Sequence, residues 1–229
     1  MMESLGLSFA TEFLDGNAID VNQEITRVTG NPVQIAMAEE RIIGILSKSS
    51  GIATAARRAF TEVGSHCMVV SGAWKKMPLE IKEIVRQAVR DGGVLPRISE
   101  KPFIYLDKNY IRILGGVKRA IKAVRSIGTP VVIQVRGEAA AVEDEAIEAA
   151  ESGAVFIMVD TGRQDHVIRV GRALEAKGLR SKVRIAFAGN VSIKDLSKVA
   201  QLDLDAVDIG YEILDAPCLP MRFDVVEVA

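Results

Sequence analysis

Apolar residues in this chain form short unbroken runs, separated by longer stretches in which they recur every three or four positions. The clearest run covers residues 154–159 and is followed by Asp160, Thr161 and Gly162. An unbroken apolar run bounded by turn residues is typical of a strand buried on both faces of a parallel sheet. Functional groups in such sheets lie just beyond the carboxyl ends of the strands. We therefore expect Asp160 to belong to a functional site.

Similar runs and helical patterns alternate along the rest of the chain. We predict further strands over residues 67–70, 103–106, 131–135, 183–187 and 206–209, with a shorter one near Val94. A helix is expected to open at Asn31-Pro32 and to be interrupted at Ser49-Ser50-Gly51. Later helices are predicted over 52–63, 78–90, 116–126, 138–151, 166–176 and 192–199, the last of them capped by Ser192.

Strand–helix alternation without a hairpin signal predicts a parallel α/β fold. We expect a (β/α) barrel, partly open, with six or seven strands and preceded by long helices. An open doubly wound sheet is the alternative, but no G-x-G-x-x-G motif follows the first strand. Residues 1–31 are predicted to be an N-terminal arm or remnant, with a short helix over 9–13 and a strand or arm over 18–28. Residues 32–229 are then the barrel domain.

Composition narrows the classes of ligand. The net charge of −1 and the 5% of aromatic residues disfavour nucleic acid and anionic membrane surfaces as partners. No signal peptide or spanning segment is expected. Cys67 and Cys218 match no metal-ligand spacing, and His66 and His166 have no partner at a useful spacing. Two free thiols are typical of a cytoplasmic protein.

Glycines follow the last two long strands. Gly189-Asn190 and Gly210 stand where barrels commonly bind a phosphate through backbone N–H groups. Ser192 would lead the receiving helix. The alternative is that these residues only permit tight turns.

Charged residues at the other strand ends add to this picture. Asp160 and Asp107 could hold a diphosphate through Mg²⁺, or ribose hydroxyls, unless they only cap a turn or helix. Lys75, Lys76 and Arg97 would form an anionic-substrate pocket, unless their loop is simply solvated.

Several strings resemble quinolinate phosphoribosyltransferase, also called nicotinate-nucleotide diphosphorylase (carboxylating). Ser50-Gly51-Ile52-Ala53-Thr54, preceded by Glu39-Glu40-Arg41 and followed by Arg57-Arg58, resembles that family's helical signature. Three later strings follow in the family's order, and the resemblance runs from about Asp15 to Ile213. These strings are Gly115-Gly116-Val117, Ile157-Met158-Val159-Asp160 and Asp208-Ile209-Gly210.

This resemblance implies a partly open barrel of seven strands, an obligate dimer, and a site for phosphoribosyl diphosphate with Mg²⁺. The family joins that donor to a pyridine dicarboxylate and releases diphosphate and CO₂. It also implies an N-terminal α/β sandwich domain, most of which does not fit into the residues before Asn31. The family has an arginine in this region that reaches the neighbouring subunit. Glu40 aligns with that arginine, so Arg41 corresponds to it only if the alignment is shifted by one residue.

The departures from the family pattern concentrate at the pyridine end. The family's Asp-Thr-Arg-Lys-Thr reads Gly72-Ala73-Trp74-Lys75-Lys76, and its His-Arg reads Pro96-Arg97. The family's Lys-Asp-Asn-His reads Asp107-Lys108-Asn109-Tyr110, and its glutamate pair reads Gln134 and Arg136. Its Ser-Gly-Gly turn reads Ala188-Gly189-Asn190, whereas Asp160 and Gly210 remain.

The resemblance thus assigns roles position by position. Asp160, Lys75 and Gln134 are the expected catalytic residues, with Asp160 also reaching Mg²⁺. The expected substrate-binding residues are Arg97, Lys76, Arg136, Asp107, Asn109 and Arg41.

Three functions remain open from the sequence. The first is a phosphoribosyltransferase of this family, and the second is a non-catalytic relative that binds a phosphorylated or nucleotide ligand. The third is a barrel enzyme with a new reaction at the retained phosphate site. Each has a phosphorylated small molecule as its ligand, and we expect a homodimer or a higher oligomer.

Overall fold

Six parallel strands form the main sheet, in the order β3-β8-β7-β6-β5-β4. The structure is a computed structural model that describes residues 6–228. Its strands are β3 (Met68–Val70), β4 (Ile104–Leu106), β5 (Val131–Val135), β6 (Phe156–Asp160), β7 (Arg184–Ala188) and β8 (Ala206–Asp208). A parallel bridge between Val70 and Leu95 continues the sheet beyond β3, near the strand expected at Val94. No pairing within the described residues joins this bridge to β4, so the barrel is partly open and the predicted α/β fold is confirmed.

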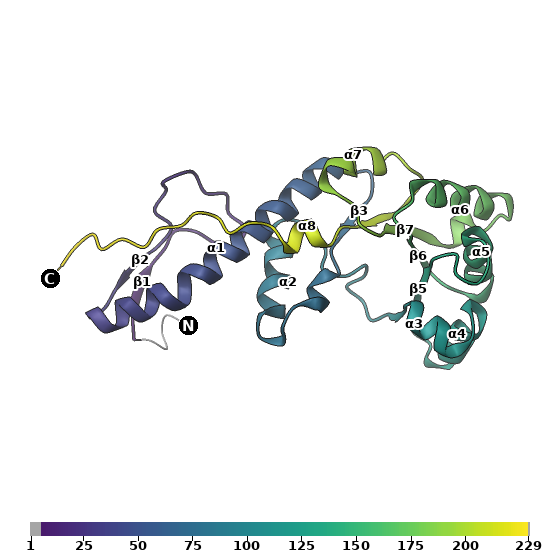
Figure 1. The fold of residues 1–229 in the computed structure, drawn as a ribbon, viewed down its shortest axis with the longest axis horizontal. Helices are drawn as coiled ribbons and strands as arrows, with labels where there is room; N and C mark the ends of the chain where they lie inside the picture. Colours follow the sequence, from purple (N-terminus) through teal and green to yellow (C-terminus); the bar gives the residue numbers. More distant parts are fainter. Residues whose placement is uncertain (1–5, 229) are drawn as a thin grey trace.

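Helices connect the strands and cover the outer side of the sheet (Figure 1). They are α1 (Pro32–Val63), α2 (Lys82–Asp91), α3 (Lys108–Leu114), α4 (Val117–Val124), α5 (Val142–Ser152), α6 (Gln164–Ala176), α7 (Leu196–Val199) and α8 (Tyr211–Leu214). Short 3-10 turns are η2 (Ala73–Lys76), η3 (Leu79–Ile81), η4 (Arg125–Ile127), η5 (Arg180–Lys182) and η6 (Ile193–Asp195). None of the helices in the described part is long and apolar enough to cross a membrane.

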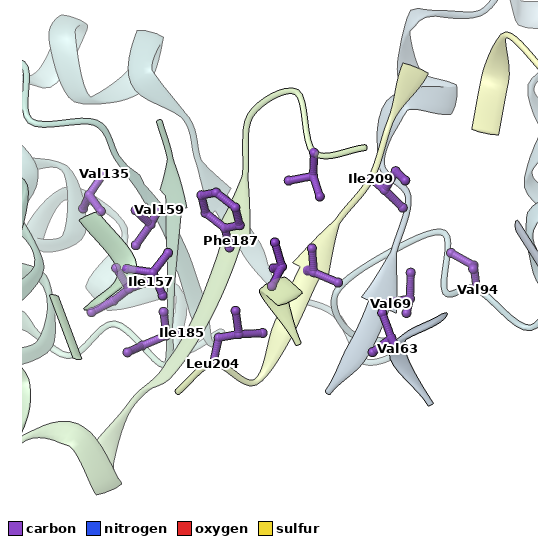
Figure 2. Packing of buried hydrophobic residues seen from close by; sticks show 14 of the residues in the cluster. Val63, Val69, Val94, Val135, Ile157, Val159, Ile185, Phe187, Leu204 and Ile209 are labelled. Atoms are coloured by element: carbon purple, nitrogen blue, oxygen red, sulfur yellow. The ribbon is translucent and has the colours of Figure 1, made fainter. Parts of the chain in front are cut away.

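The apolar core has two parts. The larger part lies between the sheet and the helices, where Val69, Ile157, Ile185 and Phe187 pack across neighbouring strands (Figure 2). The smaller part fills the barrel interior, and its β7 and β8 members are alanines: Ala186, Ala188 and Ala206. Small side chains on these two strands leave room at the carboxyl end of the barrel for the polar residues described below.

The expected interruption of the first helix is wrong: α1 is one helix of 32 residues. The Ser49 hydroxyl donates to the Ile45 carbonyl oxygen at 2.7 Å, so it bonds within the helix instead of breaking it. Gly51 is buried because the Pro217 backbone lies against it. Tertiary packing therefore overrides a local turn signal, and one long helix, not two, precedes the sheet.

The N-terminal residues also differ from expectation. The helix predicted over 9–13 is absent, and β1 (Ser8–Ala10) pairs instead with β2 (Arg27–Thr29) as an antiparallel ribbon. This ribbon lies beside the first half of α1, away from the main sheet, and the C-terminal segment runs along the same helix (Figure 1). Leu7, Ala38 and Ile42 form a small separate core there, with Phe223 packed against it. The division into residues 1–31 and 32–229 stays a prediction.

Some helix starts differ from the prediction. The helix expected from residue 78 begins with the 3-10 turn η3, and α2 itself begins at Lys82. The helix expected from residue 138 begins at Val142, because residues 136–139 form a loop held by a side chain described below. Ser192 makes no side-chain cap bond to its helix, and its hydroxyl is buried without a partner in the described part of the chain.

Candidate active site

Asp160, at the end of β6, lies in a network with two side chains of the neighbouring strand β5. Arg136 Nη1 contacts Asp160 Oδ2 at 2.6 Å, and the Gln134 amide donates to the same oxygen. The Gln134 carbonyl oxygen in turn accepts the Lys108 backbone N–H at 2.8 Å. Three of the predicted site residues are therefore brought together. The charge of Asp160 is balanced by Arg136, so this part of the site is close to neutral.

A buried glutamate holds the loop that carries Arg136. Glu145, on α5, accepts the backbone N–H groups of Arg136 at 3.0 Å, Gly137 at 2.8 Å and Ala139 at 3.0 Å. A carboxylate that accepts three N–H groups pairs donors of a loop that lies outside the regular hydrogen bonding of β5 and α5. Glu145 therefore fixes the path of the backbone from β5 to α5 and with it the position of Arg136.

Replacing Glu145 by glutamine should loosen this loop, because an amide has one acceptor oxygen and no charge. Charge-assisted hydrogen bonds contribute about 1.5–3 kcal/mol each, and the amide retains part of them, so we expect the free energy of unfolding to fall by about 2 kcal/mol. Urea denaturation measures this change. Glu148→Gln, at an exposed position of the same helix, is the control and should change stability by less than about 0.5 kcal/mol. Equal effects of the two substitutions would contradict the role of Glu145.

Lys75 and Lys76 lie on η2, directly after β3. Lys75 Nζ is 5.8 Å from the centroid of the Tyr105 ring, which comes from β4 on the opposite edge of the open barrel. A cation over an aromatic face is attracted by the ring quadrupole. Burial and the carboxylates of Asp208, Asp160 and Asp107 raise the pKa of Tyr105, so its phenol stays protonated.

Asp208, at the end of β8, is the other inner acid. The Gly72 N–H donates to its Oδ1 at 3.3 Å. Burial raises the pKa of this carboxyl from 3.8 to about 6, and the negative charge of Asp160 adds to the shift. The Gly72 N–H, Lys75 and Lys76 lower the pKa but do not offset burial.

The glycine turns expected to bind phosphate lie at the ends of β7 and β8. Gly189 and Asn190 both have positive φ, at 106° and 53°, which gives the turn after β7 a path that few side chains tolerate. Gly189 also packs on Gly162, where an added Cβ would lie 2.5 Å from the Gly162 nitrogen. However, Glu212 accepts the Ile193 N–H at 2.7 Å, so this donor at the following helix start is already paired with a carboxylate.

The pyridine-end residues are arranged around Trp74. The Trp74 indole N–H donates to the Pro96 carbonyl oxygen at 2.6 Å. The guanidinium of Arg86 lies 4.4 Å from the ring, and that of Arg97 lies 5.6 Å from it. Arg97 is exposed, so it is available to an anionic ligand, while Trp74 restricts where its guanidinium lies.

Three predicted residues lie differently. Asp107 is the N-cap of α3, where its carboxylate accepts the backbone N–H groups of Asn109 and Tyr110. Asn109 is exposed on the first turn of that helix. Arg41 is exposed on the first half of α1, which lies away from the main sheet (Figure 1), so one chain does not bring it to the strand ends.

The sequence of this chain was compared with known protein families and with individual proteins. Residues 52–224 match the family model described as quinolinate phosphoribosyl transferase, C-terminal domain. The chain belongs to this family. It is 31% identical over 215 residues to a probable nicotinate-nucleotide pyrophosphorylase [carboxylating] of Archaeoglobus fulgidus, which covers 93% of this chain and 81% of that protein. A protein of the same description from Methanothermobacter thermautotrophicus is 24% identical, covering 92% of this chain and 76% of its own length.

Solved structures of the quinolinate phosphoribosyl transferase family share the fold. Nicotinate-nucleotide pyrophosphorylase from Ehrlichia chaffeensis superposes with a TM-score of 0.80 at 16% identity, covering 95% of this chain and 78% of that one. NadC from Streptococcus pyogenes gives a TM-score of 0.79 at 21% identity, covering 96% and 76%. At these identities the likeness concerns the fold alone.

The site offers little to a metal ion directly. Asp160 Oδ2 is bonded to Arg136 and Gln134, and no group of three His, Cys, Asp or Glu side chains that could hold a metal exists among residues 6–228. Mg²⁺ prefers six oxygen ligands and often binds mainly through substrate phosphates. These residues do not fit a protein-built magnesium site in the quinolinate phosphoribosyl transferase barrel.

Sequence reasoning missed Asp208, Tyr105 and Glu145. Asp208 could have been found by the rule that selected Asp160, but the strand was expected to end one residue later, at Ile209. Tyr105 and Glu145 carry no sequence signal, because their roles depend on which residues the sheet and α5 bring near them.

Proposed function

We propose that this chain is a phosphoribosyltransferase that joins phosphoribosyl diphosphate to a pyridine dicarboxylate and forms nicotinate mononucleotide, CO₂ and diphosphate. The observation that carries the proposal is the set of polar side chains at the carboxyl ends of β5, β6 and β8, within a chain of this family. Asp160 is in place, and Lys75 reaches toward the barrel axis over Tyr105. The enzyme would act in the cytoplasm as a homodimer or higher oligomer, with Arg41 serving the site of a second copy.

In this proposal the basic residues bind the substrates and the acidic residue stabilises the transition state. Lys75, Lys76 and Arg97 bind the anionic groups of the two substrates, and the turns at Gly189, Asn190 and Gly210 approach the phosphate closely. As diphosphate leaves, the ribose carbon becomes electron-deficient, and the Asp160 carboxylate stabilises that charge while Gln134 and Arg136 hold it in place. Mg²⁺ would be bound mainly by phosphate oxygens of the substrate and would neutralise their charge, so the chain's own residues do not have to hold it.

Two observations favour a second function. Arg136 neutralises Asp160, and Trp74 occupies the place of a family arginine, so the site has less free charge for chemistry and for a dicarboxylate. A relative that binds the phosphorylated donor without turnover would show these features.

Trp74 provides the test, because it is the single tryptophan of the chain and lies beside Arg97. We expect phosphoribosyl diphosphate to change its fluorescence with saturation, and Lys75→Ala to weaken that binding about tenfold, as loss of one charge-assisted contact implies. Lys177→Ala, at the exposed C-cap of α6, is the control. Diphosphate release on adding quinolinate supports the transferase. Binding without release favours the second function, and no binding contradicts both.

A further inference from the structure

Asp208 and Asp160 lie at the same level of the barrel, on either side of β7. Asp160 is in register with Ala188, and β8 runs parallel to β7 with Val207 opposite Phe187. Continuing that register by one residue places Asp208 beside Ala188. Residues of alternating positions share a face, so Asp208 faces the interior together with Ala206 of the inner core. Both carboxyl groups therefore lie at the carboxyl end of the inner face, on either side of Ala188.

The two acids differ in what they contact. Asp160 is bonded to Arg136 and to Gln134. Asp208 accepts one long bond from the Gly72 N–H, at 3.3 Å on Oδ1, and its side chain makes no other hydrogen bond within residues 6–228. Its second oxygen therefore has no hydrogen-bond partner among residues 6–228, whereas the Oδ2 atom of Asp160 has two.

The charged groups around Asp208 come from three elements. Lys75 and Lys76 on η2 favour its carboxylate, and Asp160 on β6 opposes it. The charge of Asp208 raises the pKa of Tyr105 on β4, so this phenol stays protonated. Because burial outweighs the two lysines, the pKa of Asp208 lies at about 6, which leaves both the acid and the carboxylate populated near neutral pH. A group that gives and takes a proton works best in this range.

We propose that Asp208 donates the proton that takes the place of the lost carboxylate on the pyridine ring, an inference that rests on the proposed function. The ring nitrogen first bonds to the ribose carbon as the bond to diphosphate breaks. The bond from the ring carbon to its carboxylate then breaks, CO₂ leaves, and the electron pair stays on the carbon beside the positively charged nitrogen. The carboxyl proton of Asp208 moves to that carbon. The resulting carboxylate is stabilised by Lys75 and regains a proton from water.

The kinetic test separates the two bond-breaking steps. Asp208→Asn keeps the shape and an acceptor for Gly72 but has no acidic proton. In a single turnover with phosphoribosyl diphosphate, Mg²⁺ and quinolinate, we expect diphosphate release within about threefold of wild type and nicotinate mononucleotide formation about 100-fold slower, as for loss of one general acid. Asp208→Glu should recover part of the rate. Asp203→Asn, at an exposed position far from the strand ends, should match wild type.

The pH profile adds a readout that a purely structural role would not change. In wild type the product-forming step should slow as pH rises through a pKa at or above about 6, because bound carboxylates add negative charge, and this limb should be missing in Asp208→Asn. If Asp208→Asn forms product at the wild-type rate, or keeps the wild-type decrease in rate at high pH, the inference about Asp208 is overturned and the proposed function is not. Absence of diphosphate release from wild type overturns the proposed function and this inference with it.

Thermal unfolding tests the same proton without turnover. A carboxyl whose pKa is raised by folding stabilises the folded protein below its ordinary pKa near 4, and this contribution is lost as pH rises through about 6. Removing the buried charge should therefore raise the Tm of Asp208→Asn over wild type at pH 8 more than at pH 5. A Tm difference that is equal at the two pH values would mean that Asp208 does not hold the proton, and the proposal would fail.

Discussion

Replacing Asp160 by alanine is expected to lower kcat/KM for diphosphate release by about 10³-fold, the scale of losing a preorganised electrostatic group. In the proposed mechanism, the variant removes the charge that stabilises the electron-deficient ribose carbon. It also leaves Arg136 with Glu138 as its remaining acidic partner, at 3.2 Å, and frees the Gln134 amide to turn away. The loss should fall mainly on kcat, because Lys75, Lys76 and the glycine turns, which are proposed to bind the donor, are untouched.

The control for this experiment is Asp165→Ala. Asp165 is an exposed acid on α6, paired with the exposed Arg163, and it lies outside the group of residues at the strand ends. It should keep activity within about twofold, since surface ion pairs contribute little. Trp74 fluorescence should report unchanged donor binding in both variants. An Asp160→Ala enzyme with more than about a tenth of wild-type activity would contradict the role given to this carboxylate.

Replacing Gly51 by alanine should lower the free energy of unfolding by about 3 kcal/mol, although alanine is the better helix former. An added Cβ would overlap the Pro217 carbonyl oxygen. The C-terminal segment would have to move away from α1. That movement would break its bonds to the helix, which include Leu219 N–H to the Ser47 carbonyl oxygen at 3.0 Å and Lys48 Nζ to the Ala216 carbonyl oxygen at 2.7 Å. Each lost bond costs about 1 kcal/mol.

Gly44 on the same helix is the matched control, with the opposite expected sign. An added Cβ at Gly44 has no neighbour within 4 Å among the described residues. Gly44→Ala should therefore stabilise the chain by about 0.5–1 kcal/mol through helix propensity alone. Urea denaturation of both variants measures the difference. If Gly51→Ala were as stable as Gly44→Ala, the C-terminal segment would not be packed on α1 as described.

The strands were predictable because each consists mainly of consecutive apolar residues. Burial on both faces leaves no alternation to misread, and residues 156–160 and 131–135 form strands as expected. From β4 to β8, successive parallel strands lie side by side, as is usual for such units, whereas β3 pairs with β8 and not with β4. Asp160 was found by the same logic, whereas Gln134 and Arg136 were expected from the family resemblance. The structure brings all three together because neighbouring strand ends meet at one edge.

The remaining differences come from interactions that are distant in sequence. Ser49 and Gly51 carry turn signals, yet α1 continues because Pro217, far along the chain, packs on it. Glu145 organises the β5–α5 loop through backbone groups, which no side-chain pattern reports. Asp107 satisfied the strand-end rule but caps α3, which shows that this rule finds helix caps as well as functional acids.

The most direct test of the account is the product formed by the purified chain from quinolinate, phosphoribosyl diphosphate and Mg²⁺. We expect nicotinate mononucleotide to appear in equal amounts with diphosphate and CO₂, and to depend on Asp160. Saturable binding of the donor at Trp74 without any nicotinate mononucleotide would contradict the account. It would mean that this chain, with Trp74, Gln134 and Arg136 in place of the usual family residues, binds its ligand without catalysing the reaction.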